Sequence, residues 1–405
     1  MFDVIVVGAR CAGAPTAMLL ARRGHRVLLV DRARFPSDTL STHFLQPRGA
    51  AMLARWGLLD RLRGTGCPAI NPIVFDAGAV SVTADAEPVD GVAQAFCPRR
   101  TILDQLLVEA AVEAGCELRE ASSVDGLLWD GGRVAGIRSR GRGGREVVER
   151  ARVVVGADGM RSRVARLVDA AVYDRNPPLI GVFYTYWQGV EARNAEFHIR
   201  AGRHVLVFPT HHDLTCVFVS WRAREFDAYR ANVEGNYRAT LELVPELAAQ
   251  IREAERAAPF RGTNALPNFY RTAHGPGWAL VGDAGHHKDP TTGMGMSDAF
   301  RDAELLADAI DRGLSGAGDL GGALRRYGEE RDRRSRHLYQ WALRAAALED
   351  PAPLLPFLEA LDDDPRERIR FMSVVCGTVP YWEVLGQANQ ASVLSRACPG
   401  PERGG

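Results

Sequence analysis

Lysine is nearly absent from this chain of 405 residues. Of its 50 basic residues only Lys288 is a lysine, and 50 acidic residues balance them, so the formal net charge is zero. No basic run stands out along the sequence. An electrostatic case for binding nucleic acid or an acidic membrane surface is therefore missing, and we expect a small-molecule partner.

Long apolar runs and paired cysteines are also absent. No apolar stretch approaches the roughly 18 residues of a membrane-spanning helix, so we expect no membrane span. The seven cysteines form no Cys-x-x-Cys pair, which disfavours a zinc site, any other metal site or a disulfide framework. The sequence starts directly on a strand pattern, from which we expect no signal peptide. These features predict a cytoplasmic protein with reduced thiols.

The first 32 residues carry a nucleotide-binding pattern. An apolar run at 3–7, a helical composition at 14–23 and a second apolar run at 25–30 predict a β-α-β unit with parallel strands. Gly8 and Gly13 flank the turn between strand and helix, and Asp31 ends the second strand. Such a turn favours a dinucleotide, because the helix N-terminus binds the pyrophosphate and the acidic residue binds a ribose.

Arg10 stands where this fingerprint normally has its middle glycine. A side chain at that position either displaces the ligand slightly or contributes its guanidinium to the phosphates. We favour the second interpretation and predict that Arg10 contacts the pyrophosphate.

The rest of the chain alternates between strand and helix patterns. Strand patterns fill 67–98 and 180–222, and glycine clusters divide 123–155 into a β-meander. Helical patterns occur at 47–64, 100–115, 232–257 and 297–313, and again after 325. The predicted fold class is therefore α/β, with a discontinuous Rossmann-like nucleotide-binding domain that includes the β-meander, a second domain rich in β-sheet, and C-terminal helices.

Four segments resemble the signatures of a flavoprotein family. They are "LQPRGAAMLARWGLLDRL" at 45–62, "PRRTILDQLL" at 98–107, "VVVGADGMRSRVAR" at 153–166 and "GWALVGDAGHHKDPTTGMGMSDAFRDAELLADAI" at 277–310. Together with the fingerprint they resemble the glutathione-reductase-type flavoproteins, specifically the aromatic hydroxylases of group A that are similar to para-hydroxybenzoate hydroxylase. The resemblance spans about residues 3–345, and it also extends to geranylgeranyl-reductase-like proteins.

The resemblance implies an activity and a division of the chain. The implied enzyme is a monooxygenase that binds FAD, consumes NAD(P)H, forms a flavin C4a-hydroperoxide with O2 and hydroxylates an aromatic or polycyclic small molecule, as in secondary metabolism. We expect a monomer or a homodimer. The implied FAD-binding domain comprises 1–70, 100–178 and 268–345, the substrate-binding domain comprises 71–99 and 179–267, and a C-terminal helical segment covers 346–405.

The resemblance also implies cofactor-binding residues. The segment "DPTTGMG" precedes a helix, so its backbone amides are predicted to face the anionic edge of a reduced flavin. The full predicted set is Gly8, Arg10, Gly13, Asp31, Arg32, Arg48, Arg100, Asp158, Arg166, Gly282, Asp283, Pro290, Gly293, Met294 and Gly295.

Substrate-binding and catalytic residues are predicted from the inserted strands and the flavin motif. The predicted pocket lining is Tyr184, Tyr186, Trp187, His198, Phe208 and Pro209, and the alternative for each of them is ordinary packing of the sheet. The predicted catalytic residues are Pro290, His43 and His287, and each histidine has a purely structural alternative.

Several rival interpretations have to be weighed. A flavin-dependent halogenase needs a lysine in the substrate region, and Lys288 lies in the flavin motif instead, which disfavours halogenation. A reductase of the geranylgeranyl-reductase type and a non-catalytic flavin-binding module stay open. The run His211-His212-Asp213 is interpreted as a turn and not as a metal site. The arginine-rich helix at 325–336 is expected to be a solvated face.

Overall fold

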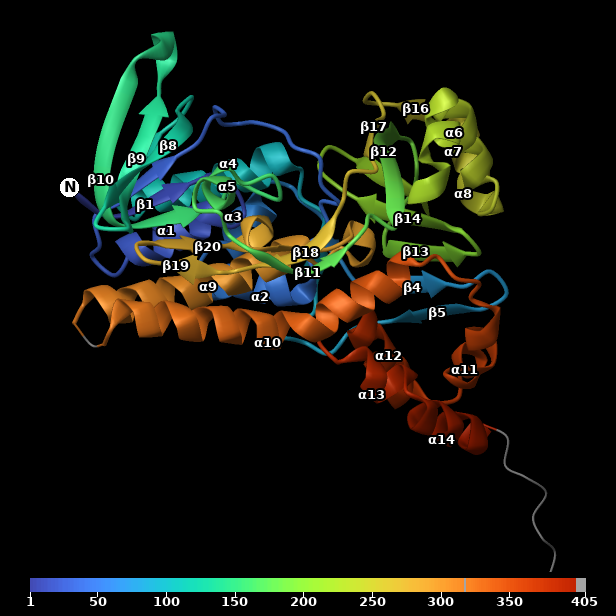
Figure 1. Ribbon diagram of the computed structural model, residues 1–405. Helices are drawn as coiled ribbons and strands as arrows, with labels where there is room; N and C mark the ends of the chain where they lie inside the picture. Colours follow the sequence, from blue (N-terminus) through green and yellow to red (C-terminus); the bar gives the residue numbers. More distant parts are fainter. Residues whose placement is uncertain (317, 398–405) are drawn as a thin grey trace, which may run out of the picture.

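The computed structural model describes residues 1–316 and 318–397. Two β-sheets lie side by side, each with its own helices, as Figure 1 shows. The long helix α10 (Leu320–Ala346) runs along the base of the first sheet towards the second. Among the described residues no helix is long and apolar enough to cross a membrane.

The first sheet is the predicted nucleotide-binding layer. Its central strands β20, β10, β1, β2 and β7 are all parallel, and β19 adds an antiparallel edge. The strands are β1 (Phe2–Val7), β2 (Val27–Val30), β7 (Glu117–Arg119), β10 (Glu146–Gly156), β19 (His274–Gly275) and β20 (Trp278–Leu280).

The predicted meander is built on one long strand. The amino half of β10 pairs antiparallel with β9 (Arg133–Arg140), which pairs with β8 (Ser123–Asp130). The carboxyl half of β10 joins the parallel sheet beside β1. A single strand therefore belongs to both layers, and the meander projects from the sheet (Figure 1).

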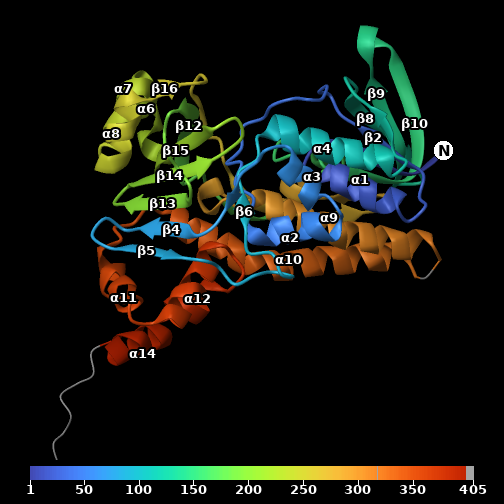
Figure 2. The ribbon, with the colours of Figure 1, turned by 180° about the vertical axis from the view of Figure 1, so that it is seen from behind.

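Helices cover both faces of the first sheet. One core lies between the sheet and the helices α1 (Gly13–Ala21), α2 (Pro47–Arg55), α3 (Leu59–Gly64), α4 (Arg100–Glu113) and α9 (Gly295–Leu314), which stand in front in Figure 2. The other face packs against the meander and α5 (Arg163–Leu167). Parallel strands buried on both faces account for the nearly continuous apolar runs in the sequence.

The second sheet is mostly antiparallel and has the order β16-β12-β15-β14-β13-β4-β5, with β17 beside β12. Its strands are β4 (Ile73–Asp76), β5 (Ser81–Ala84), β12 (Ile180–Gln188), β13 (Ala195–Arg200), β14 (Arg203–Pro209), β15 (Leu214–Arg222), β16 (Glu255–Arg256) and β17 (Arg261–Thr263). Residues far apart in the sequence thus form one layer.

The two faces of the second sheet have different covers. The helices α6 (Phe226–Ala231), α7 (Val233–Leu241) and α8 (Pro245–Glu253) close one face. The helices α11 (Leu355–Ala360), α12 (Pro365–Val375), α13 (Tyr381–Leu385) and α14 (Gln387–Ala397) pack into the core of the other face. The C-terminal segment therefore completes this core.

Short elements join the two sheets. A three-stranded ribbon of β11 (Val172–Asn176), β18 (Asn268–Arg271) and β21 (His286–His287) lies between them, and β3 (Ala69–Ile70) pairs with β6 (Ala95–Phe96). Short 3-10 turns occur at Arg142–Gly144, Ala223–Glu225, Gly282–Ala284, Pro290–Thr292 and Ala352–Leu354. Two of these turns carry the predicted flavin motif.

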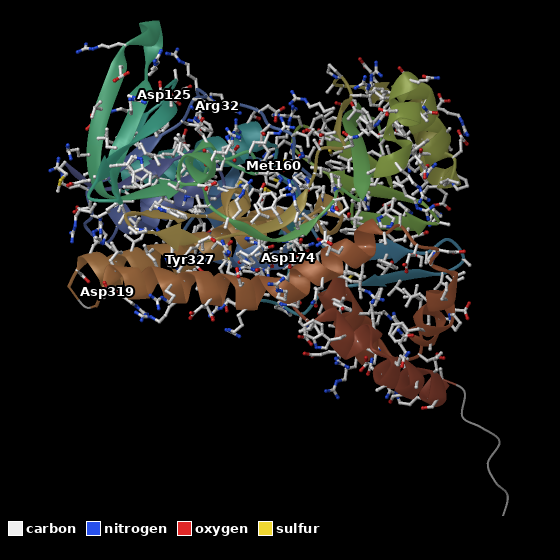
Figure 3. The ribbon with its side chains drawn as sticks, in the orientation of Figure 1. Arg32, Asp125, Met160, Asp174, Asp319 and Tyr327 are labelled. Carbon is white, nitrogen blue, oxygen red and sulfur yellow. The ribbon has the colours of Figure 1, made fainter. Side chains whose placement is uncertain are left out.

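Three predictions about local structure need correction. The helix predicted at 47–64 is broken at Gly57, whose positive φ of 75° ends α2. The helix predicted at 232–257 divides before Pro245. In the arginine-rich stretch of α10, Arg331 is buried and donates to the backbone oxygen of Arg271 at 2.9 Å, so this face is not simply solvated. Tyr327 of the same helix reaches the Leu280 carbonyl at 2.7 Å (Figure 3).

Candidate active site

The predicted fingerprint forms a tight turn between β1 and α1. Gly8 has φ of 105°, a left-handed value that a residue with a side chain rarely adopts. A Cβ on Gly13 would stand 1.7 Å from the carbonyl oxygen of Gly8, so only glycine lets helix and strand approach this closely. Both positions thus need glycine for the reasons that the sequence pattern suggests.

The amino end of α1 offers free hydrogen-bond donors. No side chain caps it and its first turn holds no acidic residue. Within the described residues, the backbone amides of Cys11 to Gly13 have no acceptor. Asp31 lies beside this turn, where it accepts from the amides of Ala9 and Ala33 at 2.7 Å each. Each carboxylate oxygen keeps a lone pair for a further donor such as a ribose hydroxyl.

Arg10 has other partners than the predicted pyrophosphate. Its guanidinium donates to Asp104 Oδ2 at 2.5 Å and to the carbonyl oxygen and hydroxyl of Ser37 at 3.1 and 3.0 Å. Asp104 is fully buried and also accepts from Arg100 at 2.8 Å. Burial lowers the pKa of Arg100, but the charge of Asp104, its hydrogen bond and further negative groups, including Asp283, together outweigh burial, so the pKa ends above its usual value. The carboxylate of Asp104 therefore forms ion pairs with both Arg10 and Arg100.

The 158–166 segment abuts the fingerprint loop through its backbone. A Cβ on Gly8 would meet the carbonyl oxygen of Ala157 at 2.4 Å. Asp158 accepts from Ser162 Oγ at 2.5 Å and from the amide of Arg163 at 2.6 Å, so its carboxylate supports the start of α5. Two predicted cofactor residues are exposed, namely Arg166 beyond this turn and Arg32 after β2. Figure 3 labels Arg32.

The turn at 282–284 reaches the same place. A Cβ on Gly282 would lie 2.7 Å from Cβ of Ala12, so this turn touches the fingerprint loop. Asp283 is exposed although its neighbours on both sides are buried. Its negative charge contributes to the raised pKa of Arg100, which places the two groups near each other. A free carboxylate thus stands beside the unpaired amides of α1.

The segment 290–295 forms the entrance to α9. Pro290 begins a 3-10 turn that ends at Gly293, and Met294 is the buried residue before the helix. A Cβ on Gly295 would meet no atom within 4 Å, so this residue borders open space. Gln46 donates to the carbonyl oxygen of Thr292 at 3.0 Å, which ties the turn to α2.

Asp289 fixes this segment to the junction of the two sheets. Its Oδ2 accepts from Asn268 Nδ2 at 2.7 Å, and its own amide donates to Asn268 Oδ1 at 2.7 Å. The amide of Leu179, where the chain crosses to the second sheet, also donates to Asp289 Oδ2 at 3.4 Å. Burial raises the pKa of Asp289 to about 7. The chain returns to the second sheet after Leu179 and has left it by Asn268. Both connections are therefore attached to the loop before Pro290.

A buried charge cluster anchors the first turn of α9. Asp298 accepts from Arg48 at 2.8 Å, from Arg301 at 2.8 Å and from Lys288. Burial would raise the pKa of Asp298, but the charges of Lys288, Arg301 and Arg48 hold it well below its usual value. Arg48 and the single lysine are thus committed to α9, although Nε of Arg48 is buried with no partner among the described residues.

An aromatic cluster lies on the second sheet next to these loops. Tyr184 and Tyr186 point to one face of β12, whereas the residues between and beside them are buried against the other face. His43 is fully buried, with its Nε2 hydrogen-bonded to the Tyr186 hydroxyl at 2.9 Å. Burial, followed by the charge of Arg100, lowers the pKa of His43 to about 3. The imidazole is therefore neutral, and His43 Nδ1 and the Tyr184 hydroxyl are buried without described partners.

Phe208 belongs to the same cluster. Its ring stacks on Phe44 at 4.6 Å, and Phe218 lies 4.6 Å from Tyr184. Pro209, the last residue of β14, is buried, but it follows Phe208 on the strand and therefore points to the opposite face. The predicted lining residues Tyr184, Tyr186 and Phe208 are thus brought together, and Pro209 is not.

Two other predicted lining residues lie elsewhere. Trp187 follows Tyr186 on β12 and therefore points to the opposite face, where it packs against Tyr237 of α7. His198 is paired with Asp76 at 3.6 Å and Glu196 at 2.9 Å. The structure does not bring these two side chains to the cluster.

Three further histidines singled out from the sequence, His287, His211 and His212, lie against other parts of the protein or in a turn. His287 Nδ1 lies 2.5 Å from the carbonyl oxygen of Pro267, and its ring stacks on Phe269. His211 Nε2 shares a hydrogen bond of 2.9 Å with Thr65 Oγ1, while His212 starts the turn into β15.

The residues fit a bound dinucleotide. Free amides, a buried acceptor in Asp31 and the open carboxylate of Asp283 converge at the carboxyl ends of parallel strands. Unpartnered hydroxyls of Thr291 and Thr292 are buried at the entrance to α9. The amides and hydroxyls can donate to phosphates and to a polar ring edge, and the carboxylates can accept from ribose hydroxyls.

A family model described as "FAD binding domain" matches residues 1–342. The chain belongs to this FAD-binding family. This match confirms the predicted resemblance to FAD-binding flavoproteins, and the chain is an oxidoreductase, as the motifs predicted. The predicted α/β class with C-terminal helices is confirmed as well.

Curated relatives of this flavoprotein include both oxygenases and reductases. The 6-methylpretetramide 4-monooxygenase of Streptomyces rimosus is 28% identical over 77% of this chain and 76% of its own. The digeranylgeranylglycerophospholipid reductase of Methanocella arvoryzae is 26% identical over 81% of this chain and 82% of its own.

Solved structures share the fold. The P. aeruginosa protein PqsL, in complex with 2-aminobenzoylacetate, has a TM-score of 0.74 and 27% identity, covering 86% of this chain and 97% of that chain. The myxobacterial chondrochloren halogenase CndH has a TM-score of 0.78 and 23% identity, covering 99% and 98%. At that identity CndH supports the fold alone.

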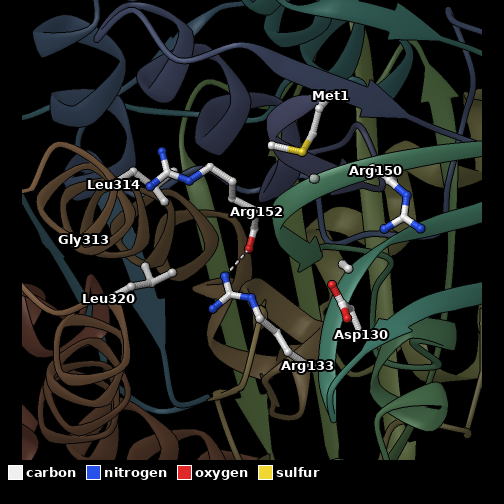
Figure 4. Close-up of a pocket in the computed structure, with 10 residues that line it drawn as sticks. Met1, Asp130, Arg133, Arg150, Arg152, Gly313, Leu314 and Leu320 are labelled. Carbon is white, nitrogen blue, oxygen red and sulfur yellow. Dashed lines mark hydrogen bonds between the residues drawn. The ribbon is translucent and has the colours of Figure 1, made fainter.

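A surface groove of the flavoprotein lies away from these residues. It has a volume of about 450 Å³ and is lined by Met1, Arg133, Arg152 and Leu314 among others (Figure 4). Met1 precedes β1, whereas the fingerprint follows it. The groove therefore lies at the amino end of β1 and the predicted flavin site at its carboxyl end. We assign the groove no part in the candidate site.

Sequence reasoning missed some residues that shape the site. Asp104 follows Arg100 by four residues in a helical pattern, and that spacing is the signal that predicts an ion pair. The pairing of Asp289 with Asn268 joins residues that are distant in the sequence, and no local pattern indicates it.

Proposed function

We propose that this flavoprotein is an NAD(P)H-consuming monooxygenase that hydroxylates an aromatic or polycyclic small molecule, in secondary metabolism. The observation that carries the proposal is the buried cluster around His43. It presents aromatic faces and unpaired polar atoms directly beside Arg100 and the predicted flavin-binding loops. An electron-rich ring bound there would lie against the cofactor.

The chain's own residues would hold the cofactor as follows. The amides at the start of α1 would bind the pyrophosphate, Asp31 a ribose, and Asp283 the ribityl chain. The backbone of Gly293 to Gly295 would face the ring edge. Bound FAD supplies the transfer of electrons from NAD(P)H and the activation of O2, while the protein supplies position and exclusion of water.

His43, held by Tyr186, would hydrogen-bond a hydroxyl group of the substrate. A neutral imidazole has one donor and one acceptor nitrogen, and Tyr186 occupies Nε2. His43 Nδ1 is then the atom that is left to exchange a hydrogen bond with a substrate hydroxyl. The low pKa of His43 keeps its imidazole uncharged, so His43 brings no positive charge to the aromatic cluster.

The relatives support this proposal without deciding it. One is named for oxygenation of 6-methylpretetramide, and PqsL was solved with 2-aminobenzoylacetate, an aromatic compound. The commitment of Lys288 to Asp298 in the flavin motif favours hydroxylation over halogenation, because that lysine does not face the aromatic cluster. A reductase acting on an isoprenoid is the second candidate, since the curated relatives include such reductases at similar identity.

The purified protein distinguishes the two candidates. A monooxygenase oxidises NADPH faster when a suitable phenol or polyketide is added, consumes O2, and releases a product that is one oxygen atom heavier. A reductase oxidises NADPH with an isoprenoid under anaerobic conditions. Stimulation by isoprenoids alone, without O2, would overturn the proposal. The Tyr186→Phe variant should lower the rate with phenols and leave the flavin content unchanged.

A further inference from the structure

Among the described residues, Arg99 has no acidic side chain as a partner. It stands at the start of α4, half-buried, with its guanidinium 4.5 Å above the ring centre of Tyr186. Its backbone amide donates to His211 Nδ1 at 3.3 Å. Within the described residues, its side-chain N–H groups have no acceptor. A planar group with five donors is thus held by stacking alone.

The arginines around it are all paired. Arg100 and Arg10 share Asp104 at 2.8 and 2.5 Å, and Arg261 contacts Asp38 at 3.1 Å. A half-buried guanidinium normally finds a carboxylate, because withdrawing the charge from water is costly. The open fork of Arg99 therefore points to an anion that the chain does not itself provide.

Arg99 and Arg100 are adjacent in the sequence, but their side chains contact different groups. Arg100 contacts Asp104 and lies near Asp283, on the side of the predicted flavin residues. Arg99 lies over Tyr186, and burial raises the pKa of the nearby Cys216 thiol while the charge of Arg99 opposes that rise. Tyr186 and Cys216 pair on β12 and β15 within the aromatic cluster. Arg99 thus faces the substrate side.

We infer that Arg99 selects substrates that carry a planar anionic oxygen pair, a carboxylate or the enolate of a 1,3-dicarbonyl, next to the aromatic ring. This inference rests on the proposed function. The guanidinium fork binds two such oxygens side by side, and stacking on Tyr186 fixes its plane. His43 is neutral, so the charge for this recognition comes from Arg99.

Matched ligand pairs test the inference on the FAD-loaded protein. The probes are salicylate against salicylamide and 3-hydroxy-2-naphthoate against its amide, with dissociation constants read from the flavin absorbance. The acids should bind the wild type about tenfold more tightly than the amides, a difference typical of one charge-assisted bidentate contact. Arg99→Gln should remove this preference, leaving amide binding and flavin content unchanged. Arg99→Lys should recover part of it, because an ammonium is a point charge without a fork.

Arg203 provides the matched control. It stacks on Trp221 of the same sheet at 3.7 Å, but it is paired with Glu225 at 2.7 Å. Arg203→Gln should leave the acid preference intact.

Three results would overturn the inference. They are equal binding of acids and amides by the wild type, loss of flavin in Arg99→Gln, and a raised KM for NADPH in Arg99→Gln with unchanged acid binding. In each case hydroxylation of a neutral aromatic substrate would still support the proposed function. If no aromatic compound of either kind binds or stimulates NADPH oxidation, the proposed function fails as well.

Discussion

Removal of the Asp104 carboxylate should destabilise the protein more than any exposed ion pair does. Asp104 is fully buried; its Oδ1 accepts from Arg100 at 2.8 Å and lies 3.4 Å from Cys11 Sγ, and its Oδ2 accepts from Arg10 at 2.5 Å. In Asp104→Asn the shape is kept and the charge is lost. Arg100, which is 9% exposed, is then left without a counter-ion.

The size of the effect follows from desolvation. Breaking a buried ion pair by removing one partner costs about 3 to 5 kcal/mol, because the remaining charge stays out of water. Arg10 adds less, since a quarter of its side chain is exposed and water screens it. We therefore expect the free energy of unfolding to fall by about 3 kcal/mol or more.

Urea unfolding of the flavin-free protein, followed by tryptophan fluorescence and circular dichroism, measures this loss. The control is Asp60→Asn, whose partner Arg63 lies 2.9 Å away on the exposed side of α3; no measurable change is expected there. The double variant Arg100→Leu, Asp104→Leu should recover much of the stability, because both buried charges are gone. A loss below about 1 kcal/mol in Asp104→Asn would refute the reasoning.

Three further predictions concern the loops of the site. Asp283→Ala should lower the flavin content of the purified protein, measured by the visible absorbance of the flavin, whereas Asp308→Ala on α9 should not; equal content in both contradicts the ribityl assignment. Gly13→Ala should prevent flavin binding, because the new Cβ would stand 1.7 Å from a carbonyl oxygen, whereas Gly64→Ala, with no atom within 4 Å, should bind normally. Because burial raises the pKa of Asp289 to about 7, the folded state binds this proton more tightly than the unfolded state and stability falls as the pH rises from about 4 to about 7. The free energy of unfolding in urea should decline across this window by up to about 1.4 kcal/mol per pH unit in the wild type and less in Asp289→Asn; parallel curves would contradict it.

Local patterns were sufficient for the cofactor layer. The run of β1, the turn at Gly8 and Gly13, and the acidic end of β2 lie within 31 contiguous residues, so short-range geometry dictates them. The same holds for the entrance to α9, where a proline and glycines precede a helical pattern. The domain boundaries and the roles given to single residues stay predictions, because neither the fold nor the relatives test them.

The aromatic residues show where local patterns end. Strand alternation predicts that Tyr184 and Tyr186 share a face and that Trp187 takes the other, but it does not say which face meets the cofactor layer. That choice depends on the pairing of β12 with β15 and on the hydrogen bond between Tyr186 and His43, which lies between β2 and α2.

By itself the amino-acid sequence determined the family, the cofactor and the order of the elements, because each is written in a contiguous run whose backbone geometry is local. Only the tertiary structure decided that Arg10 binds Asp104 and that Arg99 has no such partner. The physical reason is that a charge chooses its counter-ion by distance and burial in space, and residues 94 positions apart become neighbours only when the sheets and helices have packed.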